Sequence, residues 1–210
     1  MREKGTFPNR EEFVKIPINS VFLEGILGLP EGTKGVVLFA HGSGSSRLSP
    51  RNNFVARILR TSGVGALLFD LLTEEEDLDY SRRFDINLLT ERLILATKWL
   101  KSEPQGKDLK IGYFGASTGA AAALQAAAKI DVPIFAIVSR GGRPDLAIPY
   151  LSKVKSPTLL IVGGYDESVI ELNQRAYDEL SCEKELVVVP GATHLFEEPG
   201  ALEKVSQLAA

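Results

Sequence analysis

A serine between two glycines is the first feature of the sequence that could carry out a reaction. In "GYFGASTGAAAAL" (112–124), Ser117 lies two residues after Gly115 and two residues before Gly119. A buried strand precedes it and an alanine-rich helix follows, so we expect a tight strand-to-helix turn that exposes the hydroxyl beside the helix N-terminus. The glycines let strand and helix approach closely. We predict that Ser117 is a nucleophile; the alternative is a turn with a purely structural role.

A histidine is needed as well, because a serine hydroxyl attacks a carbonyl only when a base takes its proton. The chain has two histidines. His194, in "VVVPGATHLFEEPG", follows the last predicted strand and fits the chain order of nucleophile, acid and histidine. We predict that His194 is the base. His41, in "FAHGSGSS", comes too early for this order, and we expect it to brace its own loop.

The carboxylate that orients the histidine should follow another strand. Asp166, in "GGYDESV", comes first after the predicted strand "PTLLIVGG". It would accept the second N–H of the imidazole and stabilise the cation formed during proton transfer. We predict Asp166 as this acid, with Glu167 as the nearest alternative and Asp70 as a more remote one. Asp166 could instead cap the helix that follows it.

Acyl transfer also requires hydrogen-bond donors for the negative charge that develops on the substrate oxygen. We predict that one donor is the backbone N–H of Thr118, the residue after the nucleophile. The second donor should come from the glycine-rich loop "HGSGSS", where we favour Ser43 over Gly44. Together the two N–H groups would form the oxyanion hole.

Four arginines fall on loops that should face the same site. Arg47 and Arg51 follow the glycine-rich loop, and Arg140 and Arg143 lie in "SRGGRPD". Guanidinium groups bind carboxylate and phosphate, so these four residues are candidates for holding an anionic substrate. The alternative is that they pair at the surface with the acids of residues 74–79.

The elements that must position these residues alternate along the chain. Two segments of alternating hydrophobicity, 13–19 and 21–30, predict an antiparallel hairpin. Continuous apolar runs then predict strands buried on both faces, with helices between them. This alternation predicts an α/β fold with a mostly parallel central sheet and helices on both faces. The charged segment 73–85 is predicted to be a solvated loop. The predicted strands are 35–42, 64–72, 109–115, 132–139, 157–164 and 184–191, and the predicted helices are 49–63, 86–102, the alanine-rich helix after the serine, 145–153, 169–181 and a last short helix.

The composition narrows the class of protein. The chain has 210 residues, a formal net charge of −3 and one cysteine, Cys182. We expect one domain over residues 1–210. The mild negative charge gives no reason to expect nucleic acid or a membrane as a partner. A single cysteine forms no internal disulfide, and the polar start "MREKGTFPNREEF" does not resemble a secretory signal. We therefore expect a cytoplasmic protein, and the sequence leaves its oligomeric state open.

Taken together, these motifs resemble the α/β-hydrolase fold, and more narrowly the small hydrolases similar to dienelactone hydrolase, which have no lid domain. The resemblance covers nearly the whole chain. It implies an enzyme that cleaves a carboxylic ester or lactone through an acyl-enzyme, with no metal or organic cofactor. Dienelactone hydrolases have a cysteine at the nucleophile position, whereas this chain has Ser117, which favours a serine esterase; Cys182 is no substitute. The segments that carry the resemblance are "FAHGSGSS", "GYFGASTGA", "LLIVGGYDE" and "VPGATHLF".

Two other functions fit the same pattern. An acyl-enzyme can pass its acyl group to an acceptor other than water, which would make the protein an acyltransferase or perhydrolase with the same three residues. The fold can also serve as a non-catalytic binding module, because fold alone does not determine function. The presence of nucleophile, base, acid and both oxyanion donors favours catalysis, and a small-molecule ester or lactone is the expected substrate.

Overall fold

A β-hairpin opens the part of the chain that the computed structural model describes, residues 11–210. Strand β1 (Glu11–Ile18) pairs antiparallel with β2 (Val21–Gly28), and the turn between them places Asn19 at φ 50°. Asparagine tolerates the left-handed backbone that tight hairpin turns require. The hairpin predicted from the alternating pattern is therefore present, with its turn at the expected residues.

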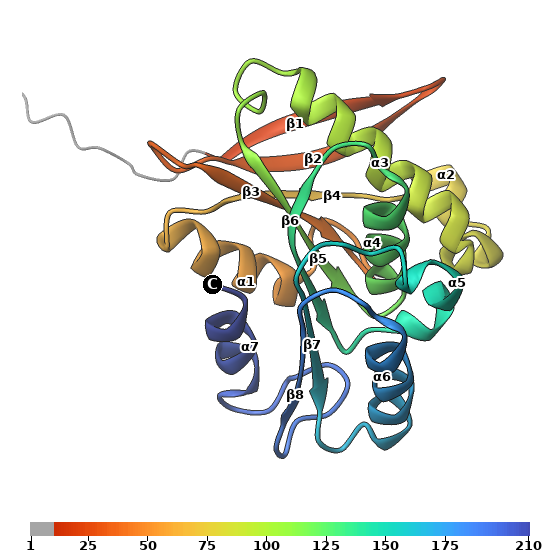
Figure 1. The fold of residues 1–210 in the computed structure, drawn as a ribbon. Coiled ribbons are helices and arrows are strands. Elements are labelled where there is room, and N and C mark those ends of the chain that lie inside the picture. Colours follow the sequence, from red (N-terminus) through yellow and green to blue (C-terminus); the bar gives the residue numbers. More distant parts are fainter. Residues whose placement is uncertain (1–10) are drawn as a thin grey trace, which may run out of the picture.

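Eight strands form one sheet in the order β1-β2-β4-β3-β5-β6-β7-β8 (Figure 1). β2 pairs antiparallel with β4, and every pair from β4 to β8 is parallel. The chain moves from β3 toward one edge of the sheet and from β5 toward the other, so the winding switches between these two strands. Ligands of open parallel sheets bind at such a switch, outside the carboxyl ends of the strands. The parallel strands are β3 (Gly35–Ala40), β4 (Gly65–Phe69), β5 (Lys110–Ala116), β6 (Ile134–Arg140), β7 (Thr158–Gly163) and β8 (Lys184–Val189).

Helices cover both faces of the sheet (Figure 1). On one face, α1 (Pro50–Thr61) and α7 (Ala201–Ala209) contact each other and form an apolar core with the sheet. A larger core lies on the opposite face. The helices of that face are α3 (Ile86–Ser102), α4 (Thr118–Lys129), α5 (Ile148–Leu151), which continues the 3-10 helix η2 (Pro144–Ala147), and α6 (Glu167–Glu179).

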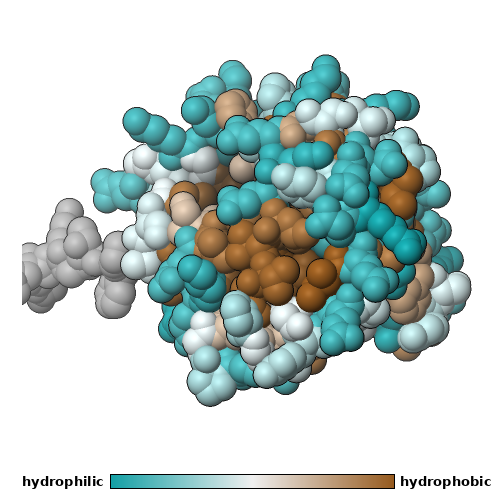
Figure 2. Space-filling view, turned by 60° about the horizontal axis from the view of Figure 1, so that its bottom comes forward, coloured by the Kyte–Doolittle hydropathy of each residue, from teal (hydrophilic) through white to brown (hydrophobic). Residues whose placement is uncertain are grey.

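The surface is mixed in character. The face drawn in Figure 2 is largely hydrophilic, and its hydrophobic residues gather mainly in one central patch. None of the helices formed by residues 11–210 combines the length and the apolar run needed to cross a bilayer.

The charged segment 73–85 is solvated, as its composition predicts, but it is not an irregular loop. It forms α2 (Glu74–Asp77) and the 3-10 helix η1 (Tyr80–Phe84). A capping box starts α2, because the Thr73 hydroxyl accepts the Glu76 N–H and the Glu76 carboxylate accepts the Thr73 N–H. The acids at the end of α2 then pair with arginines of η1 and α3, namely Arg82, Arg83 and Arg92.

The start of α4 lies unusually close to the sheet. A Cβ atom on Gly119 would lie 2.1 Å from the carbonyl oxygen of Ala40 and 2.6 Å from that of His41. A Cβ atom on Gly115 would lie 2.4 Å from the Cα atom of Ala120. Atoms of a packed interior do not approach this closely, so both glycines around the serine are required by space alone.

We predict that Gly119→Ala lowers the free energy of unfolding by about 3 kcal/mol, because the added methyl group must displace backbone and not a flexible side chain. Urea unfolding followed by circular dichroism measures this change. Gly112→Ala is the matched control, since a Cβ atom there would have its nearest neighbours at 3.4 Å. Equal unfolding midpoints for the two variants would contradict the steric role of Gly119.

Candidate active site

Ser117 occupies a strained turn at the carboxyl end of β5. Its backbone lies at φ 51° and ψ −122°, a conformation that costs a residue with a side chain about 1–3 kcal/mol. Two hydrogen bonds hold the turn: the Ser117 N–H donates to the Arg140 carbonyl (3.3 Å), and the Arg143 N–H donates to the Ser117 carbonyl (3.0 Å). Strain of this kind is typical of serines presented for nucleophilic attack.

Ser117 and His194 line the same cavity, which has a volume of about 260 Å³. The cavity lies at the switch between β3 and β5, where the loop after β3 meets the turn after β5. Gly42 permits this contact, because a Cβ atom there would lie 3.0 Å from the Cβ atom of Ser117. The other residues that line the cavity are Ser43, Ser45, Ser49, Arg51, Asn52, Ala116, Arg140 and Leu195.

His194 is hydrogen-bonded to Asp166, which follows β7. The distance between His194 Nδ1 and Asp166 Oδ2 is 2.6 Å. A carboxylate accepts at this position, so Nδ1 carries a proton and Nε2 is the nitrogen left to accept one. Asp166 occupies the N-cap position of α6, yet its side chain makes no capping hydrogen bond. The carboxylate is thus directed to the histidine and not to the helix.

The two alternative acids lie elsewhere. Glu167 is exposed on the first turn of α6. Asp70 forms an ion pair with Arg47 and also accepts the Arg47 backbone N–H. Among the three carboxylates considered from the sequence, Asp166 is the one that contacts His194.

The two predicted oxyanion donors lie together but are not both free. The Ser43 N–H donates to the Thr118 hydroxyl at 3.0 Å. This bond joins the loop after β3 to the first residue of α4. The Ser43 N–H can bind a substrate oxygen only if it breaks its hydrogen bond to the Thr118 hydroxyl or donates to both acceptors at once. Gly44, the alternative donor, adopts a left-handed backbone at φ 69°.

His41 braces the loop after β3. Its Nε2 accepts the Leu71 N–H at 3.0 Å, so the proton of the neutral ring lies on Nδ1, which donates to the Gly42 carbonyl at 3.0 Å. The side chain is buried, and this burial lowers the pKa of His41. The ring therefore stays neutral and connects the loop to the end of β4.

The four candidate arginines divide into two pairs. Arg47 forms ion pairs with Asp70 and Glu24, and Arg143 forms a bidentate pair with Asp145; neither lines the cavity that contains Ser117. Arg51 and Arg140 do line it. The expected alternative, pairing with the acids of residues 74–79, is wrong, because the acids at the end of α2 pair with arginines of η1 and α3.

Arg140 is the most buried of these arginines, with 6% of its surface exposed. Its Nη1 donates to the Leu195 carbonyl at the long distance of 3.5 Å, and the guanidinium carbon lies 5.8 Å from the centre of the Phe196 ring. Burial, and to a smaller extent the nearby charge of Arg51, lowers the pKa of Arg140 to about 10. The group is still a cation at neutral pH.

Sequence reasoning missed two residues at this site. Gly141 adopts φ 51°, and a Cβ atom there would lie 3.0 Å from the His194 carbonyl oxygen, so its lack of a side chain makes room for the base. Asn52 lines the cavity, is 2% exposed and has no partner for its Oδ1. The sequence does indicate Asn52, because it is a polar residue at a helical spacing that places it on the same buried face of α1 as Val55, Ala56 and Leu59.

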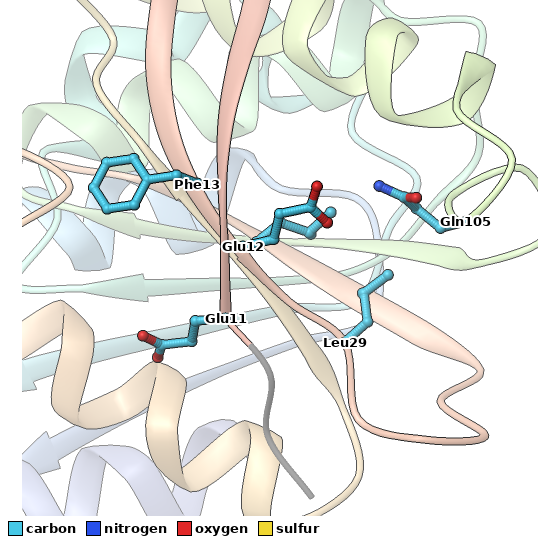
Figure 3. A pocket seen from close by; sticks show the side chains of 6 residues that line it. Glu11, Glu12, Phe13, Leu29 and Gln105 are labelled. Carbon is cyan, nitrogen blue, oxygen red and sulfur yellow. The ribbon is translucent and has the colours of Figure 1, made fainter. Parts of the chain in front are cut away.

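A larger cavity, of about 570 Å³, opens beside β1 and β2 (Figure 3). It shares no lining residue with the cavity that contains Ser117. Its lining contains two carboxylates and one amide but no serine, histidine or cysteine that could act as a nucleophile or base. The lining residues are Glu11, Glu12, Phe13, Leu27, Leu29 and Gln105.

The winding of the sheet, the strained serine after β5 and the histidine–carboxylate pair after β8 and β7 define an α/β-hydrolase fold. The sequence matches the Dienelactone hydrolase family over residues 23–209. The chain therefore belongs to the dienelactone hydrolase family.

Known proteins agree with this assignment. The crystal structure of a dienelactone hydrolase from Anabaena variabilis is 55% identical, with a TM-score of 0.93, and the match covers 96% of this chain and 95% of that one. Est1E from Butyrivibrio proteoclasticus shares the fold at 16% identity, with a TM-score of 0.79 over 94% of this chain and 97% of that one.

A curated relative from Mycobacterium tuberculosis carries the name "Putative phosphoribosyl transferase". It is 56% identical over 202 residues, which make up 96% of this chain and 46% of the relative. The chain thus spans about half the length of this relative.

We predict that acidification destabilises the protein through His41. Its pKa is lowered in the folded state, so below the ordinary value of 6.5 the unfolded chain binds more protons and the free energy of unfolding falls. The slope is up to about 1.4 kcal/mol per pH unit. Urea unfolding between pH 7.5 and pH 5.5 measures it, with His41→Gln as the control, since the glutamine oxygen accepts the same N–H without titrating. Identical pH dependence in the two proteins would refute this role.

Proposed function

We propose that the protein is a serine hydrolase that cleaves a carboxylic ester or lactone, with Ser117 as nucleophile, His194 as base and Asp166 as orienting acid. One observation carries the proposal: the 2.6 Å bond between His194 and Asp166 lies beside a serine held on a strained turn in the same cavity. Each residue comes from the carboxyl end of a different strand, which is where parallel sheets bind ligands.

The reaction begins with attack of Ser117 Oγ on the substrate carbonyl carbon while His194 Nε2 takes the hydroxyl proton. Asp166 stabilises the imidazolium that results. The carbonyl oxygen becomes an oxyanion and accepts the Thr118 N–H, together with the Ser43 N–H once it leaves the Thr118 hydroxyl. The tetrahedral intermediate then collapses, His194 protonates the leaving alkoxide, and an ester joins the acyl group to Ser117.

Water completes the cycle. His194 takes a proton from a water molecule, and the hydroxide attacks the acyl carbonyl carbon. A second tetrahedral intermediate collapses to the carboxylic acid, and the proton returns from His194 to Ser117 Oγ. If another acceptor replaces water, the same residues perform acyl transfer or perhydrolysis. These reactions share every step up to the acyl-enzyme, so the identity of the product distinguishes them.

The first test is hydrolysis of p-nitrophenyl butyrate by the natural protein and by Ser117→Ala. We expect the variant to lose about 10³-fold or more in kcat/KM, since the oxyanion donors and binding alone retain a residual rate. Ser102→Ala, at an exposed serine at the end of α3, is the matched control and should keep full activity. A fluorophosphonate probe should label Ser117. If the natural protein neither turns over the ester nor takes the label, the binding-module function is the better account.

A second test separates Asp166 from its neighbour. Asp166→Asn keeps the size of the side chain but favours the wrong imidazole tautomer, so we expect kcat to fall by about 10³-fold or more. Glu167→Gln makes the same chemical change one residue later and should leave kcat unchanged. Circular dichroism verifies that both variants fold. Comparable losses in the two variants would contradict the role of Asp166.

A further inference from the structure

A buried cation faces the candidate active site, and no carboxylate of residues 11–210 forms an ion pair with it. Arg140 lies on β6, the strand beside β5. In the register of these two strands it is opposite Ala116, the residue before the nucleophile. The side chain is 6% exposed, its Nε has no hydrogen-bond partner among the described residues, and its Nη1 makes one long bond to the Leu195 carbonyl. Buried charges are usually paired, because an unpaired ion loses its hydration without compensation. Within residues 11–210, Arg140 thus has no carboxylate to compensate its charge.

A second cation lines the same cavity. Arg51 lies in the first turn of α1, and that turn contains no acidic residue. Positive charge at a helix N-terminus is unfavourable, since the helix dipole already places partial positive charge there. Arg51 forms an ion pair with Glu197 at 2.7 Å. The Glu197 side chain is 61% exposed, so solvent weakens the electrostatic attraction between the two groups. The Arg51 Nε has no partner.

Both guanidinium groups line the cavity, and the charge of Arg51 is near enough to help lower the pKa of Arg140. Arg51 and Arg140 come from different elements, and one exposed carboxylate offsets their charges. This wall of the cavity thus carries excess positive charge beside Ser117. Arg47 and Arg143, by contrast, are fully matched by Asp70 and Asp145.

We propose that Arg140 and Arg51 bind a phosphate group on the ester or lactone that Ser117 attacks. The proposal rests on the proposed function and names its substrate class. A phosphate monoester carries nearly two negative charges at neutral pH and presents three oxygens, so it can accept hydrogen bonds from both guanidinium groups at once. A carboxylate presents only two oxygens, and a single guanidinium fork can occupy both of them.

Inorganic phosphate is the probe that tests this site. We expect it to inhibit hydrolysis of the neutral ester p-nitrophenyl butyrate competitively, and acetate at equal ionic strength to inhibit at least tenfold more weakly. Arg140→Gln should raise the inhibition constant of phosphate by about 10- to 100-fold, because charge-assisted hydrogen bonds are lost. Arg57→Gln removes the same charge from an exposed position on α1 and should leave the inhibition constant unchanged.

Direct binding keeps the test independent of catalysis. Calorimetry measures the affinity of phosphate for the Ser117→Ala protein and for the same protein that also carries Arg140→Gln. The protein with Arg140→Gln should bind phosphate more weakly, as in the inhibition experiment. Arg140→Lys serves if the glutamine variant does not fold, since lysine keeps the charge and loses the planar fork; it should still weaken phosphate binding.

The outcomes separate the two proposals. Phosphate binding that depends on Arg140, in a protein that cleaves no ester, supports this site and overturns the proposed hydrolysis. Ester cleavage with no phosphate binding, or with binding that Arg140→Gln does not weaken, overturns the phosphate site and leaves the hydrolase in place. Tighter binding of acetate than of phosphate would likewise overturn it.

Discussion

The contact between the first turn of α4 and the ends of β3 and β5 is the constraint on which the site depends. Because Gly119 has no side chain, the helix begins against the Ala40 carbonyl, and the loop after β3 reaches the turn that presents Ser117. The same closeness permits the hydrogen bond from Ser43 to Thr118. A side chain at position 119 would push α4 away from the end of β3 and so separate Ser117 from Ser43, the proposed oxyanion donor on the loop after β3. The glycine thus controls the geometry of the proposed catalytic site through backbone spacing alone.

Two charge arrangements meet in one cavity. On one side, the Asp166 carboxylate fixes the imidazole of His194 and compensates the charge that the ring acquires. On the other, Arg51 and Arg140 contribute positive charge that no buried carboxylate within residues 11–210 balances. Under the proposed mechanism the first arrangement serves the reaction, and under the proposed phosphate site the second selects the substrate. Because they come from separate elements, specificity can change without loss of the chemistry, as is common for sites placed on a shared fold.

Much of this organisation is predictable from the sequence. The strands and their helices follow from hydrophobic periodicity, and Ser117, Asp166 and His194 follow from their places at strand ends, since parallel strands bring such residues to one edge. The partners of long polar side chains are not predictable in this way. Arg47 and Arg51 pair with carboxylates on distant segments that only the folded topology brings near, whereas Arg143 pairs with Asp145, two residues further along the chain. The short helix in segment 73–85 is not predicted, because the charged composition of the segment favours a loop more strongly than the Thr73 capping box favours a helix.

The order of the strands also has a consequence for how the protein is made. Ser117 leaves the ribosome well before Asp166, and His194 follows only with the last strand and the loop behind it. A nascent chain that has already formed β3, β5 and α4 therefore holds the serine on its turn with no base beside it. Under the proposed mechanism, such a chain cannot activate its hydroxyl. Hydrolytic capability then appears only after β8 has joined the edge of the sheet and the loop behind it has placed His194.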